Sequence, residues 1–285
     1  MRTSFLTAVM ATTASVALGG AASALDHHGH ASWGYDGEGG PEHWGMLSAD
    51  NASCGSGHEQ SPIDLHAVSD VAGSVPALHW DAGEGSVTDN GHTIKVGLED
   101  AGSLHLDDRD YDLVQFHFHA GSEHTVDGQQ YPLEVHFVHA SDDGHLAVVG
   151  VFFEEGAANP ALDAIWAAIP HEGEHHEVDD VDPGAFLPDD RSAWRYAGSL
   201  TTPPCSEGVA WTVMQTPITA SAAQIEAFTA HYSNNFRPVQ ALHARTLYSG
   251  GAAFSPPSSS AAHLSSGSLV SRRVKTPYVC VNDPT

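Results

Sequence analysis

The chain has 285 residues, of which 36 are Asp or Glu and only 10 are Lys or Arg, so its formal net charge at pH 7 is −26. A surface with this charge repels nucleic acids and anionic membranes, and we therefore exclude both as partners. Hydrophobic residues make up 41% of the chain, which is enough for a substantial buried core.

The N-terminal segment at 1–24 has the pattern of a cleaved secretory signal. Arg2 precedes an apolar run from about Phe5 to Leu18, and residues 22–24 read ASA. The apolar run is interrupted by Thr and Ser and is too short for a membrane anchor. No later segment is apolar enough to span a bilayer, so we predict an exported protein without a membrane span in its mature chain.

Short apolar or alternating runs after the signal predict a sheet-dominated domain. The predicted strands are 92–98, 103–106, 111–119, 133–140, 146–153 and 208–214. Predicted helices are short, at 160–169 and 221–232, and Ser221 can cap the second one. The length of the chain is compatible with one large β-rich domain or two small ones.

Two segments look irregular. The charged run HEGEHHEVDDVD at 171–182 is typical of a solvated loop. From Ser249 to about Ser268 the chain is rich in Ser, Gly, Ala and Pro, which predicts a flexible linker. We therefore place the folded domain at 25–248 and a linker with a C-terminal tail at 249–285.

Three cysteines, Cys54, Cys205 and Cys280, occur in this predicted exported chain. An odd number in an oxidising compartment predicts one disulfide and one cysteine left over. The residues alone leave all three pairings open.

The segment QFHFHAGSEH, which begins at Gln115, combines a strand pattern with metal-binding side chains. Successive side chains of a strand point to opposite faces, so Gln115, His117 and His119 share one face. Phe116 and Phe118 share the other face. One face is therefore apolar, and the other offers ligands for a metal ion.

A second strand, LEVHFVHA, places Glu134, His136 and Val138 on a common face. If the two strands are neighbours, His136 lies beside His117 and His119. Three neutral imidazoles with an open fourth position describe a catalytic zinc site, whereas a structural zinc site closes with four protein ligands. The pattern therefore predicts Zn²⁺ as the cofactor.

Two other classes of protein compete with this interpretation. A cupin-like metal enzyme also has a His-x-His followed by Glu, and it would use Glu123 as a ligand. A non-enzymatic zinc-binding protein would explain the histidine clusters at 27–30 and 171–176. Zinc content and catalytic activity of the mature chain distinguish these classes.

Seven sequence blocks, taken together, resemble the α-class carbonic anhydrases, in particular the exported bacterial members. They are WGYDGEGGPEHW at 33–44, QSPIDL at 60–65, NGHTIKV at 90–96, FHFHAGSEHTVDG at 116–128, LEVHFVHA at 133–140, SLTTPPCSEGVAW at 199–211 and NFRPVQ at 235–240. They occur in the order of that family and cover roughly residues 33–248. The resemblance implies a single, mostly β domain around a large, mainly antiparallel central sheet. It also implies reversible hydration of CO₂ to bicarbonate and a proton.

The resemblance assigns the metal ligands and the groups around them. His117, His119 and His136 are expected to hold Zn²⁺, whose bound hydroxide attacks CO₂. Gln115 and Glu134 are expected to orient these rings through hydrogen bonds.

Further catalytic roles follow from the same resemblance. Thr201 is expected to accept a hydrogen bond from the hydroxide and to donate its own proton to Glu123. His92 resembles the family's proton shuttle, for which an imidazole has a suitable pKa, and Tyr35 resembles the residue that orders the waters in between.

An apolar wall beside the metal is expected to receive CO₂. The positions that match this wall or a neighbouring substrate contact are Val138, Val148, Leu200, Thr202, Val209 and Trp211.

The resemblance also chooses the disulfide, because Cys54 and Cys205 match positions that exported relatives join. Cys280 is then left over and offers a route to a disulfide-linked homodimer. The expected location is the periplasm or the outside of the cell.

Overall fold

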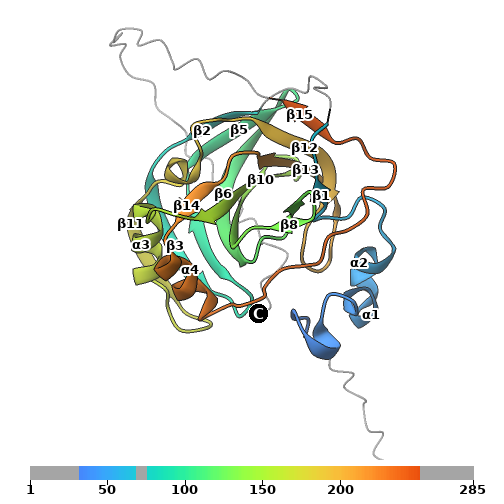
Figure 1. Cartoon of the computed structure of the whole chain (residues 1–285), viewed down its shortest axis with the longest axis horizontal. Helices are drawn as coiled ribbons and strands as arrows, with labels where there is room; N and C mark the ends of the chain where they lie inside the picture. The colour runs from blue at the N-terminus through green and yellow to red at the C-terminus, as the bar shows by residue number, and fades with distance from the viewer. Residues whose placement is uncertain (1–31, 69–75, 251–285) are drawn as a thin grey trace, which may run out of the picture. The chain divides into compact units, whose positions relative to one another are not determined.

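The structure, a computed structural model, describes residues 32–68 and 76–250 (Figure 1). The predicted signal at 1–24 and Cys280 lie outside the described residues. So does the predicted tail, apart from residues 249 and 250, which belong to the last strand.

Strands make up most of the regular structure of the described residues. They are β1 Asp64–Leu65, β2 Ala77–Trp80, β3 Gly83–Asp89, β4 Ile94–Leu98, β5 Gly102–Leu106, β6 Arg109–Ala120, β7 Thr125–Val126, β8 Gln129–Gln130, β9 Leu133–Ala140, β10 Leu146–Glu155, β11 His175–Val181, β12 Ala193–Ser199, β13 Glu207–Met214, β14 Ile218–Ala220 and β15 Tyr248–Gly250. The α-helices are α1 Trp44–Leu47, α2 Ser53–Ser56, α3 Pro160–Ala167 and α4 Ala222–Thr229. The 3-10 turns are η1 Gly37–Gly39, η2 Ala49–Asn51 and η3 Pro183–Phe186.

One sheet of 12 strands organises the domain. Its main path runs β11-β3-β4-β6-β9-β10-β13-β12-β15, while β14 joins β10 and the β2–β5 pair extends from β6. Neighbouring strands are antiparallel except for β10 with β13 and β10 with β14. A separate sheet of 3 strands has the order β1-β7-β8. The mostly β fold with a large, mainly antiparallel sheet and short peripheral helices is therefore confirmed.

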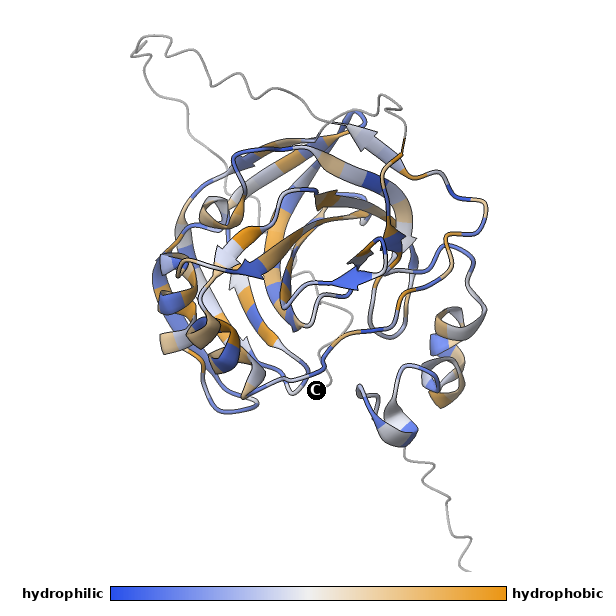
Figure 2. Ribbon diagram, viewed as in Figure 1, coloured by the Kyte–Doolittle hydropathy of each residue, from blue (hydrophilic) through white to orange (hydrophobic). Residues whose placement is uncertain are grey.

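Hydrophobic and hydrophilic residues alternate along parts of the central strands (Figure 2). Because successive side chains point to opposite faces, a core face is separated from a more polar one. Phe116 and Phe118 of β6 are fully buried, and Phe116 packs on Phe137 of β9 with ring centroids 5.2 Å apart. His139 of β9 is also fully buried, and Trp80 Nε1 donates a hydrogen bond of 3.1 Å to its Nε2. Burial lowers the pKa of His139 to about 4, so this residue is a neutral core histidine.

Helices α3 and α4 begin where the sequence predicts and end two to three residues earlier. Asn159 caps α3 with its side chain, and Ser221 and Gln224 form a capping box at the start of α4. Trp166 of α3 stacks on Phe228 of α4 with ring centroids 5.3 Å apart. The two helices therefore lie side by side (Figure 1).

The charged run at 171–182 is not simply a loop, and this prediction was wrong. Its residues from His175 to Val181 form β11, which pairs with β3 at the edge of the large sheet. Most side chains of β11 are exposed, so neither of its faces has the apolar alternation that marks a half-buried strand. Strands β3 and β12 were also not predicted.

Candidate active site

Three histidines converge on the face of the sheet that is turned away from the phenylalanine core. His117 and His119 come from β6 and His136 from the neighbouring β9, and His117 and His136 are direct partners in the strand register. One ring nitrogen of each histidine lies within 4.8 Å of those of the other two. The alternation of β6 therefore directs both of its histidines to one point.

Hydrogen bonds occupy the other nitrogen of both β6 rings. His117 Nδ1 lies 2.9 Å from Gln115 Oε1, and His119 Nδ1 lies 2.6 Å from the backbone oxygen of Asn235. Amide and carbonyl oxygens only accept hydrogen bonds, so each Nδ1 carries the proton. Each Nε2 then presents its lone pair to the point of convergence.

Glu134 holds the third histidine and the turn beyond β6. Its Oε1 lies 2.9 Å from His136 Nε2 and 2.8 Å from His124 Nδ1. Its Oε2 accepts hydrogen bonds from the backbone nitrogens of Glu123 and His124 at 2.8 and 2.9 Å. Burial alone raises the pKa of this carboxyl, but the two histidines hold it well below its usual range. The missing side chain of Gly150 on β10 leaves space for the Glu134 carboxylate, because a Cβ there would lie 2.9 Å from Glu134 Oε1.

This donor set fits a metal ion. His119 is only 1% exposed, and its Nε2 has no hydrogen-bond partner among the described residues. Burial lowers the pKa of both His117 and His119, which favours the neutral form that binds metals. Burial also disfavours the charged form of His136, but the carboxylate of Glu134 outweighs this effect and raises its pKa. A carboxylate behind a metal-binding ring increases the basicity of the ligand, and three imidazoles are typical of catalytic zinc.

A buried carboxylate lies beside the three rings. Glu123 Oε1 accepts a hydrogen bond of 2.8 Å from the backbone nitrogen of Arg237. Its Oε2 lies 3.6 Å from His119 Nε2 and 3.8 Å from His136 Nδ1, and it has no hydrogen-bond partner in the described part of the chain. The structure therefore lacks the hydrogen bond from Thr201 to Glu123 that the resemblance implies, although Thr201 lines the same site.

The histidines lie in a cavity of about 270 Å³. The predicted substrate contacts that line it are Val138, Val148, Leu200, Thr202 and Trp211. Val209 does not line this cavity, because it is buried in the apolar cluster that packs around Trp211. The remaining wall is apolar enough to receive a small, uncharged molecule.

His92 lines the cavity from the turn before β4. Gly91 in this turn has a φ of +80°, which favours glycine, and Asn90 Oδ1 accepts hydrogen bonds from the backbone nitrogens of His92 and Thr93 at 3.0 and 2.9 Å. The His92 ring stacks on Trp33 with ring centroids 3.7 Å apart. Burial lowers the pKa of His92 below its ordinary value.

Tyr35 lines the same cavity and packs edge-on against Trp33 and Trp44. Burial and, after it, the charge of Glu123 raise the pKa of its phenol well above the ordinary value. Its hydroxyl therefore stays protonated and available as a hydrogen-bond donor.

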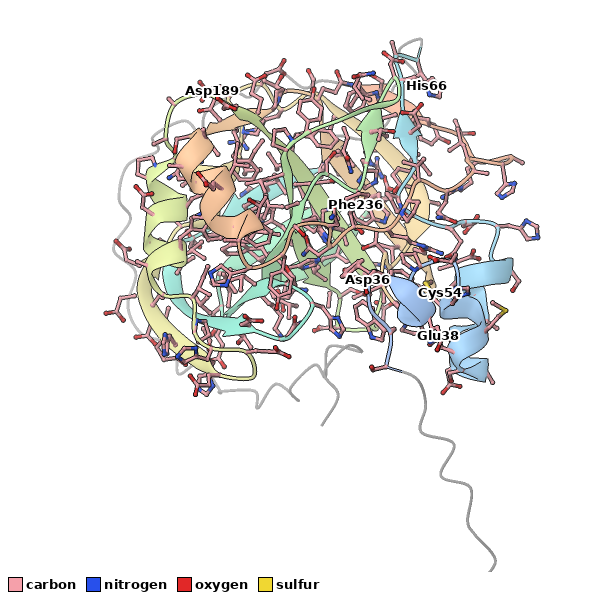
Figure 3. The ribbon with its side chains drawn as sticks, turned by 60° about the horizontal axis from the view of Figure 1, so that its bottom comes forward. Asp36, Glu38, Cys54, His66, Asp189 and Phe236 are labelled. Atoms are coloured by element: carbon pink, nitrogen blue, oxygen red, sulfur yellow. A yellow bond between two sulfur atoms is a disulfide. The ribbon has the colours of Figure 1, made fainter. Side chains whose placement is uncertain are left out.

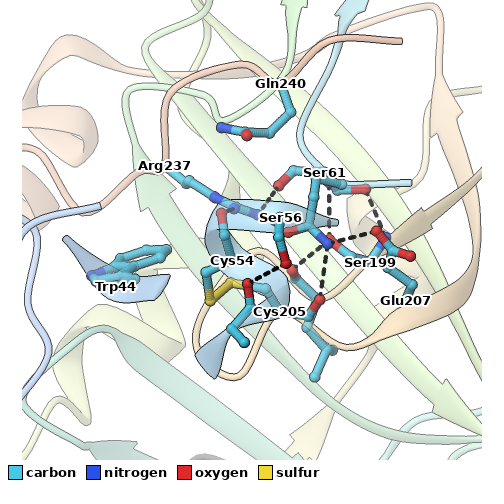
Figure 4. The surroundings of a disulfide bond; sticks show 12 residues. Trp44, Cys54, Ser56, Ser61, Ser199, Cys205, Glu207, Arg237 and Gln240 are labelled. Atoms are coloured by element: carbon cyan, nitrogen blue, oxygen red, sulfur yellow. Dashed lines mark hydrogen bonds between the residues drawn. A yellow bond between two sulfur atoms is a disulfide. The ribbon is translucent and has the colours of Figure 1, made fainter. Parts of the chain in front are cut away.

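A disulfide joins Cys54 of α2 to Cys205, which follows the loop that carries Thr201 (Figure 4). It bridges 151 residues with a Cα–Cα distance of 5.0 Å, so the pairing expected from the resemblance is present. Buried Arg237 supports the same region, because its guanidinium donates to Cys54 O at 2.8 Å and to Gln60 Oε1 at 2.9 Å. Gln60 Nε2 in turn donates to Cys205 O at 3.1 Å.

Several residues that support the site had no assigned role in the sequence analysis. His124 connects Glu134 to the hydroxyl of Tyr196, which lies 2.7 Å from its Nε2. Asn235 contacts β6, and Arg237 contacts the disulfide region. His124, Asn235 and Arg237 lie inside the matched blocks, but most of their partners are distant in sequence, as Tyr196 is from His124. No local pattern could therefore have identified them.

The fold and the site define a mostly β protein whose large sheet carries a candidate three-histidine metal centre. The profile described as eukaryotic-type carbonic anhydrase matches residues 39–250. The chain belongs to this family, the α-class carbonic anhydrases, and is an enzyme of that family.

Individual relatives agree with this assignment. A carbonic anhydrase of Pectobacterium carotovorum is 44% identical over 219 residues, which cover 75% of this chain and 89% of the relative. A carbonic anhydrase of a Nostoc species is 46% identical over 224 residues, with 76% and 85% covered. The solved α-carbonic anhydrase of Thermovibrio ammonificans, in complex with the inhibitor sulfanilamide, has a TM-score of 0.74 at 44% identity. That match covers 76% of this chain and 98% of the other.

Family membership excludes the cupin-like alternative and favours an enzyme over a non-enzymatic zinc-binding protein. Among the residues that the structure describes, no helix is both long and apolar enough to cross a membrane.

Proposed function

We propose that this enzyme catalyses the reversible hydration of CO₂ to bicarbonate and a proton at a Zn²⁺ ion held by His117, His119 and His136. The observation that carries the proposal is the convergence of three ring nitrogens within 4.8 Å in a cavity. When bound, the metal ion supplies a Lewis acid that makes a nucleophilic hydroxide available near neutral pH.

The neighbouring side chains hold the three ligands in place. Gln115 Oε1 lies 2.9 Å from His117 Nδ1, and Glu134 Oε1 lies 2.9 Å from His136 Nε2. Both nitrogens point away from the proposed position of the metal ion. These contacts fix the tautomer and the orientation of each ring. The backbone oxygen of Asn235 has the same function for His119.

Thr201 and Glu123 orient the reacting oxygen. The unpaired Oε2 of Glu123 is a strong acceptor, and we infer that the Thr201 hydroxyl donates to it during the reaction. The Thr201 oxygen can then only accept a hydrogen bond from a group held at the three histidines. This selects a protonated oxygen and directs its free lone pair at the substrate.

The apolar wall holds CO₂ without strong polar contacts. Val138, Val148, Leu200 and Trp211 supply it, and Thr202 offers a hydroxyl at its border. Val209 contributes to this wall only indirectly, because it packs in the apolar cluster around Trp211.

His92 and Tyr35 take part in transferring the proton that the reaction releases out of the cavity. The imidazole of His92 lines the cavity and has a pKa low enough to give the proton up to buffer. The protonated hydroxyl of Tyr35 orders water between His92 and the centre.

We further propose that residues 1–24 are a cleaved signal, that 25–248 form the catalytic domain and that 249–285 form a tail. The disulfide between Cys54 and Cys205 supports export to the periplasm or the medium, because such bonds persist in oxidising compartments. An N-terminal sequence of the exported protein that begins at Met1 would contradict this.

The variant His136→Ala tests the metal site. It removes one of three proposed ligands, so we expect loss of bound zinc and a decrease in CO₂ hydration of more than about 100-fold. This decrease is larger than that expected from removing a residue that only hydrogen-bonds to a ligand. Metal analysis and stopped-flow hydration assays measure the two effects. The same substitution at exposed His145 is the control and should leave both unchanged. A His136→Ala enzyme with full zinc content and normal activity would refute the assignment.

A further inference from the structure

Lys95 is an unusual residue in this chain. The sequence contains two lysines, Lys95 and Lys275, against 36 acidic residues. Exposed carboxylates lie on the surface, for example Asp36 and Glu38 at η1 and Asp189 far from them (Figure 3). Lys95, in contrast, is half-buried on β4 and lines the cavity that contains the three histidines.

The strand register directs this lysine to the candidate active site. Lys95 is the direct partner of His117 in the antiparallel pair of β4 and β6. Side chains of direct partners lie on the same face of a sheet, with Cβ atoms about 5 Å apart. The flanking residues Ile94 and Val96 are fully buried on the opposite, core face. The ammonium of Lys95 is therefore on the cavity side.

Among the described residues, no hydrogen bond or ion pair involves the Lys95 ammonium, whereas Arg109 and Arg195 pair with Asp143 and Asp107. The residues that line the cavity include no Asp or Glu at all. The two carboxylates beside the histidines, Glu123 and Glu134, are buried and are not part of this lining. A half-buried cation without a partner among the described residues, in a cavity whose lining has no carboxylate, has the properties of an anion-binding position.

The charge of Lys95 also acts at the histidine centre. After burial and the two neighbouring histidines, it is a further cause of the lowered pKa of His117. Its electric field therefore extends over the space in which the reaction takes place.

We propose that Lys95 is a binding residue for small monovalent anions in this cavity, bicarbonate being the physiological one. The inference rests on the proposed function, in which one reaction partner, CO₂, is neutral and the other is an anion. A protein with a net charge of −26 repels bicarbonate at long range. One cation in the lining of the cavity offsets this repulsion beside the three histidines, without attracting polyanions to the outer surface.

The test uses thiocyanate and bicarbonate as probes, titrated calorimetrically into the zinc-loaded enzyme at constant ionic strength. Lys95→Met keeps most of the aliphatic stem and removes the charge, and we expect it to raise the dissociation constant of both anions about five- to tenfold. Lys95→Gln is a second neutral variant with the same expected effect. Lys95→Arg keeps the charge and should stay within about twofold of the wild type.

Arg109→Met is the matched control, because it removes one cation from an exposed ion pair outside the cavity. It changes the net charge of the protein as Lys95→Met does, and anion binding should remain unchanged. The inference fails if the neutral variants at Lys95 bind both anions as tightly as the wild type. It also fails if Lys95→Arg is as weak as Lys95→Met, or if Arg109→Met is equally weakened. The titration needs no turnover, so a wild-type enzyme without CO₂ hydration would overturn the proposed function independently of this result.

Discussion

His92 and His139 differ in burial and therefore in their ability to exchange a proton. His139 is fully buried beside Trp80, and a pKa of about 4 keeps it neutral over the whole physiological range. His92 stacks on Trp33 and is only half-buried, so its pKa is lowered but its ring still reaches the cavity. Of these two histidines, only His92 can take up and release a proton during turnover.

Removal of His92 therefore has a diagnostic kinetic effect. In His92→Ala, we expect kcat of CO₂ hydration in weak buffer to fall about tenfold or more, while kcat/KM changes little, because proton release is slowed but CO₂ conversion is not. Adding imidazole buffer should restore much of kcat. Stopped-flow assays at low and high buffer concentration measure this.

A ligand role and a passive surface role give other results for the same variant. Loss of zinc and of kcat/KM would indicate a ligand, and an unchanged kcat in weak buffer would remove His92 from the mechanism. The control His231→Ala removes an exposed histidine at the end of α4 and should leave kcat unchanged in both buffers.

At the scale of elements, one side chain connects the turn of His92 to β6, the strand that carries His117 and His119. Asn235 Nδ2 donates hydrogen bonds to His92 O at 3.1 Å and to Phe118 O at 2.9 Å. Its Oδ1 accepts from the backbone nitrogen of Ala120 at 2.8 Å. Asn235 therefore fixes the turn of His92 relative to the strand of His119.

The variant Asn235→Ala removes the side-chain partner of the Ala120 backbone nitrogen and of the His92 backbone oxygen, whereas Phe118 O keeps its hydrogen bond from Thr93 Oγ1. We expect the free energy of unfolding to fall by about 2–4 kcal/mol and kcat in weak buffer to fall as well. Denaturant melts and buffer-dependent kinetics measure the two effects. Asn159→Ala, which removes the N-cap of α3, is the control and should cost about 1 kcal/mol without a change in kcat. If both variants lose stability equally and retain full kcat, Asn235 has no positioning role.

The predictability of the elements follows from their burial. β9 and β10 are apolar enough to be recognised in the sequence, and both have their predicted positions within two residues. β11 reads HHEVDDV and is exposed except at Val178 and Val181, so periodicity carries little signal for it. Its pairing with β3 at the sheet edge determines its conformation, and this information is not local.

For the site, the sequence predicted the convergence of His117, His119 and His136 because two strand periodicities suffice for it. The resemblance added Thr201 and Glu123, although their mutual hydrogen bond is not formed. The role of Asn235 was not accessible, because its partner His119 is 116 residues away. Contacts of this range depend on the tertiary fold alone.

At the scale of the whole molecule, the bond between Cys54 and Cys205 joins the N-terminal helices to the loop of Thr201. The two cysteines are 151 residues apart in sequence, so the bond strongly reduces the conformational entropy of the unfolded chain. Arg237 contacts the same region and also Glu123, so the bond lies close to the candidate active site.

Replacing both cysteines in Cys54→Ser/Cys205→Ser should lower the free energy of unfolding by about 2–5 kcal/mol. The melting temperature should fall by about 5–15 °C, which calorimetry can measure. Cys280→Ser is the matched control and should melt as the wild type does. Peptide mapping that joined Cys280 to Cys54 or Cys205 would contradict the pairing, whereas a dimer on non-reducing gels would indicate that Cys280 links two copies.

The exposed edge strand β11 has a consequence for how copies of the protein meet. An open strand edge is a template on which another chain can add, and this route leads to aggregation. Here Glu177, Asp179 and Asp180 occupy that edge. Two such edges in contact would bring like charges to about 5 Å across a new ladder, which is strongly unfavourable. The acidic edge thus disfavours the association of copies of the enzyme into fibres through their strand edges.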